Sequence, residues 1–180
     1  MNVNRIVAGV ATVVALGAVV PVAAVSAASA ATPVAQGVQV AHDHGHGQHT
    51  PRIVKDWLKA WNAGDGKRLG SLFTKDGRYT DHAFGPVFVG PAGVEQWVAN
   101  TYGGIDGVHG ELRWAERHGD EIVFGWTFSG HIKGAPSAFE VPAVTVLKVR
   151  GSKIASNDDY YSFAEVAEQS GLPADWNPGA

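Results

Sequence analysis

The chain has 180 residues, a formal net charge of -3 and no cysteine. A weakly acidic chain does not favour nucleic acid or an anionic membrane surface as a partner, because both are bound by clustered lysine and arginine side chains. The lack of cysteine excludes disulfide bonds, so a folded domain in this chain must be stabilised by its hydrophobic core.

The first 30 residues have the pattern of a Sec-type signal peptide. Arg5 precedes a run of small and apolar residues at positions 6–25, and residues 28–30 have the small-x-small form of a cleavage site. Pro21 and the many small side chains favour a cleaved signal over a retained membrane anchor. We therefore predict a secreted, extracellular protein that has no membrane contact after signal cleavage.

Residues 31–49 are predicted to be a disordered linker, because they are rich in glycine and histidine and have no apolar period. Four histidines between positions 42 and 49 are able to chelate a transition metal. Nothing in the pattern fixes their geometry, however, so we predict a solvated linker and no metal site. One folded domain is expected at residues 50–176, followed by a short tail at 177–180.

Three helices are predicted in the first half of the domain. Thr50 offers a capping hydroxyl before Pro51, and apolar residues then recur at helical spacing up to Gly64. Asp65 is expected to cap a second, shorter helix. The Gly-Pro pair at residues 90–91 indicates the start of a third.

The remaining pattern predicts strands. Residues 77–81 are expected to form one strand, and from Glu111 onward apolar residues alternate with polar ones between turn sequences at 118–120 and 150–153. Four strands in series indicate an antiparallel meander. Because the helices come first and the strands follow, we predict an α+β fold in which a curved sheet wraps around the helices.

Asp81 is the first candidate catalytic residue. It ends the strand predicted at residues 77–81, with Tyr79 on the same face and Phe84 just beyond. Burial in such an apolar site raises the pKa of a carboxyl group, which can then act as a general base. A turn aspartate that faces solvent is the alternative interpretation.

Asp159 is the second candidate. Alternation along a strand directs one of the neighbours Asp158 and Asp159 inward and the other outward, and Asn157, Asp159 and Tyr161 share one face. Burying an aspartate is costly, so an inward carboxylate that is retained is typical of a functional group.

His131 is the third candidate, because an imidazole can orient a carboxylate or transfer a proton near neutral pH. It follows the strand that contains Trp126, and an ordinary polar residue is the alternative interpretation. The histidines of the domain do not have the spacing of metal ligands, so neither a structural zinc nor a cofactor is predicted.

Large aromatic residues and their polar neighbours are expected to bind the ligand. Rigid rings with few polar groups are typical of a pocket for a small apolar or aromatic molecule, and a purely structural core is the alternative. The predicted substrate-binding residues are Trp57, Trp61, Tyr79, Trp97, Trp126, Asn157 and Tyr161.

The order of these elements resembles the nuclear transport factor 2-like superfamily, particularly its SnoaL-like branch. Residues 57–65, 72–73 and 79–81 resemble the opening of bacterial ketosteroid isomerases, and residues 153–161 with 170–172 resemble the SnoaL-like ending. The resemblance implies a cone-shaped α+β barrel whose open end takes a small, mostly apolar molecule.

The resemblance also implies roles for single residues. Asp81 falls where the isomerases keep their proton-shuttling carboxylate, and Asp159 falls where several polyketide cyclases and epoxide hydrolases keep an aspartate. Trp57 stands in place of the tyrosine that donates to the oxyanion, residues 144–145 lack the second acid of the isomerases, and Ser162 replaces the second aspartate of the D-Y-Y-D ending. These departures exclude a steroid isomerase specifically.

Three functional hypotheses follow. The first is an isomerase, cyclase or dehydratase that uses Asp81 as base and Asp159 as acid, with Trp57 or His131 as an oxyanion donor. The second is a secreted module that binds a small molecule without reacting it. The third is a homodimer that pairs through its sheet and functions by that surface.

Overall fold

A computed structural model describes residues 50–173 and 175–176. The predicted signal peptide at 1–30, the linker at 31–49 and the tail at 177–180 lie outside the described residues. Within the described part of the chain, no helix has the length and apolar character needed to cross a bilayer.

The three predicted helices are present, and a fourth follows the last strand. Their bounds are α1 (Arg52–Asn62), α2 (Gly66–Ser71), α3 (Gly90–Gly104) and α4 (Phe163–Ser170). The prediction for Asp65 is confirmed, because its Oδ1 accepts the Arg68 N–H at 2.9 Å. The capping role expected for Thr50 is wrong: Pro51 precedes the first residue of α1, and no side chain caps that helix.

The unpredicted helix α4 has clear signals at both ends. The hydroxyl of Ser162 accepts the backbone N–H of Glu165 at 3.1 Å, and Gly171 follows the helix in the left-handed conformation with a φ of 71°. A glycine adopts this conformation without the steric cost that a side chain would bring.

Six strands form one sheet in the order β2-β1-β6-β5-β4-β3. Their bounds are β1 (Phe73–Asp81), β2 (Val87–Val89), β3 (Ile105–His118), β4 (Glu121–Ile132), β5 (Phe139–Arg150) and β6 (Lys153–Tyr161). The predicted antiparallel meander is confirmed in β3 to β6. The strand expected at 77–81 begins earlier, at Phe73, and pairs in parallel with β6.

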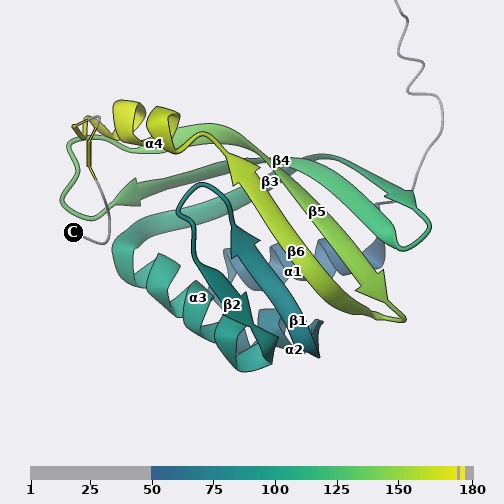
Figure 1. Cartoon of the computed structure of the whole chain (residues 1–180). Helices are drawn as coiled ribbons and strands as arrows, with labels where there is room; N and C mark the ends of the chain where they lie inside the picture. Colours follow the sequence, from purple (N-terminus) through teal and green to yellow (C-terminus); the bar gives the residue numbers. More distant parts are fainter. Residues whose placement is uncertain (1–49, 174, 177–180) are drawn as a thin grey trace, which may run out of the picture. The chain divides into compact units, whose positions relative to one another are not determined.

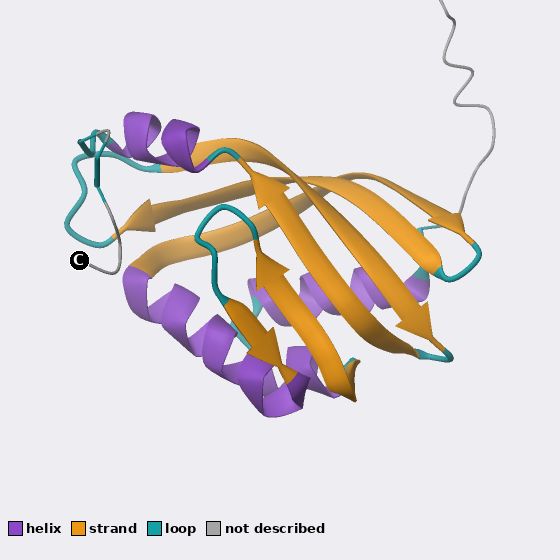
Figure 2. Cartoon of the chain, viewed as in Figure 1, coloured by secondary structure: helices purple, strands orange, loops and turns teal. Residues whose placement is uncertain are grey.

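The sheet curves around the helices and does not close on itself, so the predicted α+β cone is confirmed (Figures 1 and 2). Helix α1 contacts β3, and α3 contacts β1, β2 and β3. Helix α4 contacts β5 near the C-terminal end of the described chain. The helices therefore cover the concave face of the sheet, where a cavity can remain between them.

Stacked and edge-to-face aromatic rings form the centre of the core. The ring of Trp57 stacks on Trp61 with centroids 5.4 Å apart, and it meets Phe124 and Trp126 edge-on at 5.4 and 5.5 Å. Such pairs contribute about 0.5–1.5 kcal/mol each beyond the burial of their area. Tight aromatic packing is how this domain holds its fold without a disulfide.

Candidate functional site

The parallel pairing of β1 with β6 places Asp81 directly beside Asp159 in the sheet. Asp81 and Asp159 form the last pair in the register of β1 with β6, and each is only 2% exposed. Both carboxylates line the same cavity. The two aspartates singled out by the sequence thus converge, although they lie on strands from opposite ends of the domain.

The cavity has a volume of about 840 Å³ and opens between the helices and the concave face of the sheet. This volume is within the range typical of small-molecule sites. Its walls are mostly apolar, and the aromatic lining residues are Trp61, Phe84, Phe88, Trp97, Trp126, Phe128, Tyr161 and Trp176.

Asp159 accepts hydrogen bonds from three buried side chains. Its Oδ1 accepts the Thr145 hydroxyl at 2.6 Å and the Asn157 amide at 2.7 Å, and its Oδ2 accepts the Tyr79 hydroxyl. Burial raises the pKa of Asp159 from 3.8 to about 7, and the charge of Asp81 adds to the rise, while these hydrogen bonds oppose it. Asp159 therefore changes its protonation state near neutral pH.

Two indole N–H groups fix the side chains that donate to Asp159. The Trp126 indole donates to the Thr145 oxygen at 3.0 Å, and the Trp57 indole donates to the Asn157 carbonyl at 2.9 Å. Because the Thr145 oxygen already accepts from Trp126, its own proton is directed at Asp159. The tryptophans thus orient the donors of this carboxylate.

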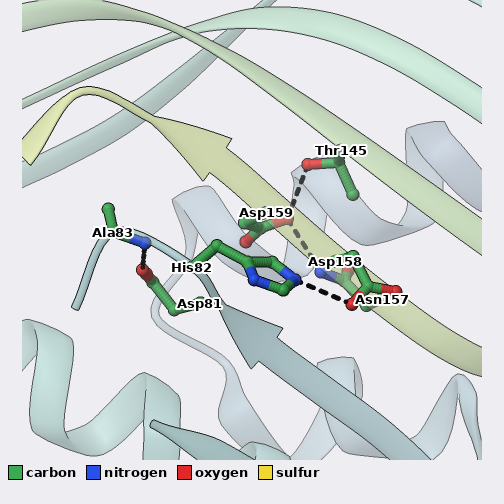
Figure 3. A network of polar contacts seen from close by, with 7 residues as sticks. All are labelled: Asp81, His82, Ala83, Thr145, Asn157, Asp158 and Asp159. Carbon is green, nitrogen blue, oxygen red and sulfur yellow. Dashed lines mark hydrogen bonds and ion pairs between the residues drawn. The ribbon is translucent and has the colours of Figure 1, made fainter. Parts of the chain in front are cut away.

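Asp81 is held by backbone and side-chain donors of the β1–β2 turn and of β6. Its Oδ1 accepts the N–H group of Ala83 at 2.9 Å (Figure 3). The same oxygen accepts the Phe84 N–H at 2.8 Å, and Oδ2 accepts the Tyr161 hydroxyl at 2.7 Å. Burial raises its pKa, and these hydrogen bonds oppose the rise.

The tyrosine bonds are reciprocal across the two strands. Tyr79 of β1 donates to Asp159 of β6, and Tyr161 of β6 donates to Asp81 of β1. Burial raises the pKa of both phenols well above the ordinary value, and the nearby carboxylates add to this. Both tyrosines therefore remain hydrogen-bond donors over the whole neutral range.

Asp158 points to the opposite face of β6, as alternation predicts. Its Oδ1 lies 3.0 Å from Nε2 of His82 (Figure 3). The His82 ring stacks on Tyr160 at 4.4 Å. These side chains are partly exposed and do not line the cavity. This outer pair provides a matched comparison for substitutions of the inner carboxylates.

The predicted substrate-binding residues divide into two groups. Trp61, Trp97, Trp126 and Tyr161 line the cavity. Trp57, Tyr79 and Asn157 lie behind it and belong to the hydrogen-bond network of Asp159.

The structure places neither expected oxyanion donor in the cavity. His131 is exposed and does not line the cavity, and its Nε2 lies 2.9 Å from the carbonyl oxygen of Ala135. The indole N–H of Trp57 is bonded to Asn157. His131 points outward because the inward positions of β4 alternate through Trp126, Phe128 and Ile132.

The sequence analysis did not assign several residues of the site, among them Thr145, Lys133 and Trp176. Thr145 is fully buried and donates to Asp159, and its inward position on β5 was readable from strand alternation. Lys133 and Trp176 line the cavity from the β4–β5 connection and the C-terminal segment. No sequence pattern indicates these two, because their placement depends on tertiary contacts.

Within the described residues, no group of three or more histidine, cysteine or acidic side chains is arranged to hold a metal ion. The chemistry that this site can perform with its own residues is proton transfer, because two carboxyl groups with raised pKa values face one apolar cavity.

A model of the SnoaL-like domain family matches residues 54–157. No match to the chain is found among curated proteins. Among solved structures, a protein from Catenulispora acidiphila DSM 44928 with a ketosteroid isomerase-like fold, in complex with trimethylamine, is 46% identical to the chain. The similarity covers 72% of this chain and 99% of that one, with a TM-score of 0.70.

More distant structures share the fold. An NTF2-like protein from Burkholderia thailandensis E264 is 19% identical, with 68% of this chain and 96% of that chain covered and a TM-score of 0.62. TerC, co-crystallized with polyporic acid, is 16% identical, with coverages of 67% and 96% and a TM-score of 0.60.

Proposed function

The chain belongs to the SnoaL-like domain family, and on this basis we propose that its cavity binds a small, mostly apolar molecule on which Asp81 and Asp159 perform proton transfer. The observation that carries the proposal is the convergence of the two carboxyl groups, both with raised pKa values, on one cavity with mostly apolar walls. The family match and the structural comparisons confirm the predicted resemblance to the nuclear transport factor 2-like superfamily at the level of the fold.

The proposed step acts on a carbon next to a carbonyl group. The ionised Asp81 removes a proton from this carbon. The electrons of the C–H bond form a carbon–carbon double bond, and the π electrons of the carbonyl group take the proton of Asp159 onto the oxygen. The product is an enol, with Asp81 protonated and Asp159 ionised. In an isomerisation, Asp159 takes back the enol proton while Asp81 returns its proton to the far end of a conjugated double bond. In a dehydration, Asp159 takes back the enol proton while Asp81 protonates a hydroxyl group on the carbon β to the carbonyl, which leaves as water.

The raised pKa values suit this division of roles. With Asp159 titrating at about 7, a proton is available on it at neutral pH, and the charge on Asp81 favours keeping that proton. Transfer by one placed group accelerates a reaction about 10²- to 10⁴-fold. A rate far below that of a steroid isomerase is expected, because neither Trp57 nor His131 supplies an oxyanion donor.

Related structures support a small molecule as the ligand. The Catenulispora protein was crystallised with trimethylamine, and TerC, which shares only the fold, was crystallised with polyporic acid. Binding without reaction is the second candidate function, and it is favoured because neither of the two expected oxyanion donors, Trp57 and His131, lines the cavity.

The test uses proton exchange in D₂O with α-tetralone, a small aromatic ketone, followed by NMR. The parent protein should exchange the protons next to the carbonyl, and Asp81→Asn should lower the rate at least 10²-fold. Asp158→Asn, on the outer face, is the matched control and should retain the parent rate. Equal exchange in parent and Asp81→Asn would refute the catalytic proposal, and a ligand recovered bound but unchanged would support the binding module.

Export and pairing remain part of the proposal. The pattern of residues 1–30 supports secretion, and N-terminal sequencing of protein from culture fluid should find a start near residue 31.

Trp114 and Tyr160 are both 47% exposed, and they lie in one cross-strand row on the outer face of the sheet, with Gly125 and Val144 between them. This apolar row supports a homodimer, which sedimentation of the domain would test.

A further inference from the structure

Carboxyl groups outnumber cationic groups among the lining residues of the cavity. Two carboxyl groups, those of Asp81 and Asp159, line it together with one cationic side chain, Lys133. The Lys133 amine donates to the carbonyl of Gly103 at 2.9 Å and lies 3.6 Å from Asp106, and its side chain is half exposed. Its charge is therefore directed to these partners rather than to the carboxyl pair.

Aromatic rings surround the carboxyl pair. Tyr161 donates to Asp81, and Trp126 is connected to Asp159 through the Thr145 hydroxyl. The Trp97 ring lies 6.0 Å from the Tyr79 ring, whose hydroxyl bonds to Asp159. Tyr161, Trp126 and Trp97 all line the cavity. Carboxylates flanked by aromatic faces attract ammonium groups by charge and by cation–π interaction.

The acceptor capacity of the two carboxyl groups limits the kind of ammonium group. Asp159 accepts from Thr145, Asn157 and Tyr79, and Asp81 likewise accepts three donors. A carboxylate offers about four acceptor positions, so each retains about one. A primary ammonium group brings three N–H donors and would leave some unpaired, whereas a tertiary group brings one and a quaternary group brings none.

We propose that the carboxyl pair of this cavity recognises an alkylated ammonium group, so that the substrate is a tertiary or quaternary amine with an apolar body. This inference rests on the proposed function, which identifies the cavity as the ligand site. It adds that the substrate carries a positive charge. A cavity of about 840 Å³ has room for an apolar body in addition to the ammonium group. The positive charge would also stabilise the enol-forming step, for which neither Trp57 nor His131 provides an oxyanion donor.

The test compares choline with its uncharged isostere, 3,3-dimethyl-1-butanol, and with the primary amine ethanolamine. Tryptophan fluorescence reports binding, because three tryptophans besides Trp176 line the cavity. Choline should bind at least about 10-fold more tightly than either competitor at pH 8, which corresponds to the attraction expected from a cation on aromatic faces. Equal or tighter binding of the uncharged isostere would overturn the inference.

Two further measurements separate the inference from the proposed function. Asp81→Asn should lower the preference for choline, because it removes one of the two carboxylates, while the control Asp158→Asn keeps it; an undiminished preference in Asp81→Asn contradicts the assignment. Ketone exchange that depends on Asp81, together with no preference for choline, refutes only the inference. A preference for choline without exchange refutes only the catalytic proposal.

The unmodified protein provides a test that does not depend on the folding of a variant. Its affinity for choline should rise several-fold between pH 5 and pH 8, as the carboxyl pair loses its proton, while its affinity for 3,3-dimethyl-1-butanol stays constant. Tyr79 and Tyr161 face the pair and keep their protons throughout, because their pKa values are raised. Choline affinity that is independent of pH would count against the inference.

Discussion

Replacing Asp159 with asparagine removes the ionisation of this side chain and nearly preserves its shape. In the folded protein burial raises the pKa of Asp159 to about 7, whereas an aspartate in the unfolded chain titrates near 3.8. Between these two values the folded state binds more protons than the unfolded state. The stability contributed by this group is therefore complete at pH 3.8 and below, is lost as pH rises towards 7, and stays low above it.

The magnitude follows from the displacement of the pKa. Each pH unit corresponds to about 1.4 kcal/mol, so the rise from 3.8 to about 7 predicts a loss of about 4 kcal/mol of unfolding free energy across this interval. Asparagine cannot ionise, so Asp159→Asn should not show this loss. Relative to the parent, the variant should gain about 4 kcal/mol of stability between pH 4 and pH 8.

Urea unfolding followed by tryptophan fluorescence at pH 4.5, 6, 7 and 8 measures this difference. Asp158→Asn is the control, because it removes a carboxylate from the outer face of the same strand, where the side chain is 30% exposed. The control should follow the parent. If parent and Asp159→Asn show the same dependence on pH, burial does not control the ionisation of Asp159, and the roles assigned to the pair are wrong.

Four other substitutions test the hydrogen bonding, packing and capping described above. Thr145→Val removes a donor to Asp159 and the acceptor of Trp126, so it should raise the pKa of Asp159 further and cost about 1–3 kcal/mol in urea unfolding. Gly70→Ala would place a Cβ 2.4 Å from the Pro91 carbonyl oxygen, so it should cost about 1–3 kcal/mol in thermal unfolding. The Cβ of Gly103→Ala would meet nothing within 4 Å, so this substitution should stabilise α3 by about 0.5–1 kcal/mol. Asp65→Ala should cost about 1 kcal/mol, because it removes the cap of α2; unchanged thermal midpoints would contradict the packing and capping arguments.

Local patterns in the sequence predicted the elements that depend on local interactions. The apolar spacing of α1, the cap at Asp65 and the alternation of the meander all appear in the structure. Alternation also predicted that one of Asp158 and Asp159 points inward, and the structure buries Asp159 and leaves Asp158 30% exposed. Ile132 points inward, so alternation places the neighbouring His131 on the outer face of the sheet. His131 was a candidate because of the chemistry of its imidazole, without regard to its position on the strand.

Long-range pairing could not be predicted in this way. The parallel contact of β1 with β6 brings Asp81 beside Asp159, and nothing near either residue encodes it. The bond from Trp57 to Asn157 joins residues 100 positions apart. Because of this bond, Trp57 supports the hydrogen-bond network of Asp159, whereas the sequence predicted that it contacts the ligand. Helix α4 is different, because Ser162 and Glu165 have the spacing of a capping box that the sequence already contained.

The reciprocal tyrosine bonds also bear on the order of folding. Each joins residues 80 positions apart, whereas the hairpins of the meander close over a few residues. Closing a long segment costs more chain entropy, so β1 should join β6 late, after the meander has formed. Interactions made after the transition state slow unfolding without accelerating folding. Tyr161→Phe should then increase the unfolding rate in stopped-flow experiments and leave the refolding rate nearly unchanged. This result would show that the carboxyl pair assembles last and opens first.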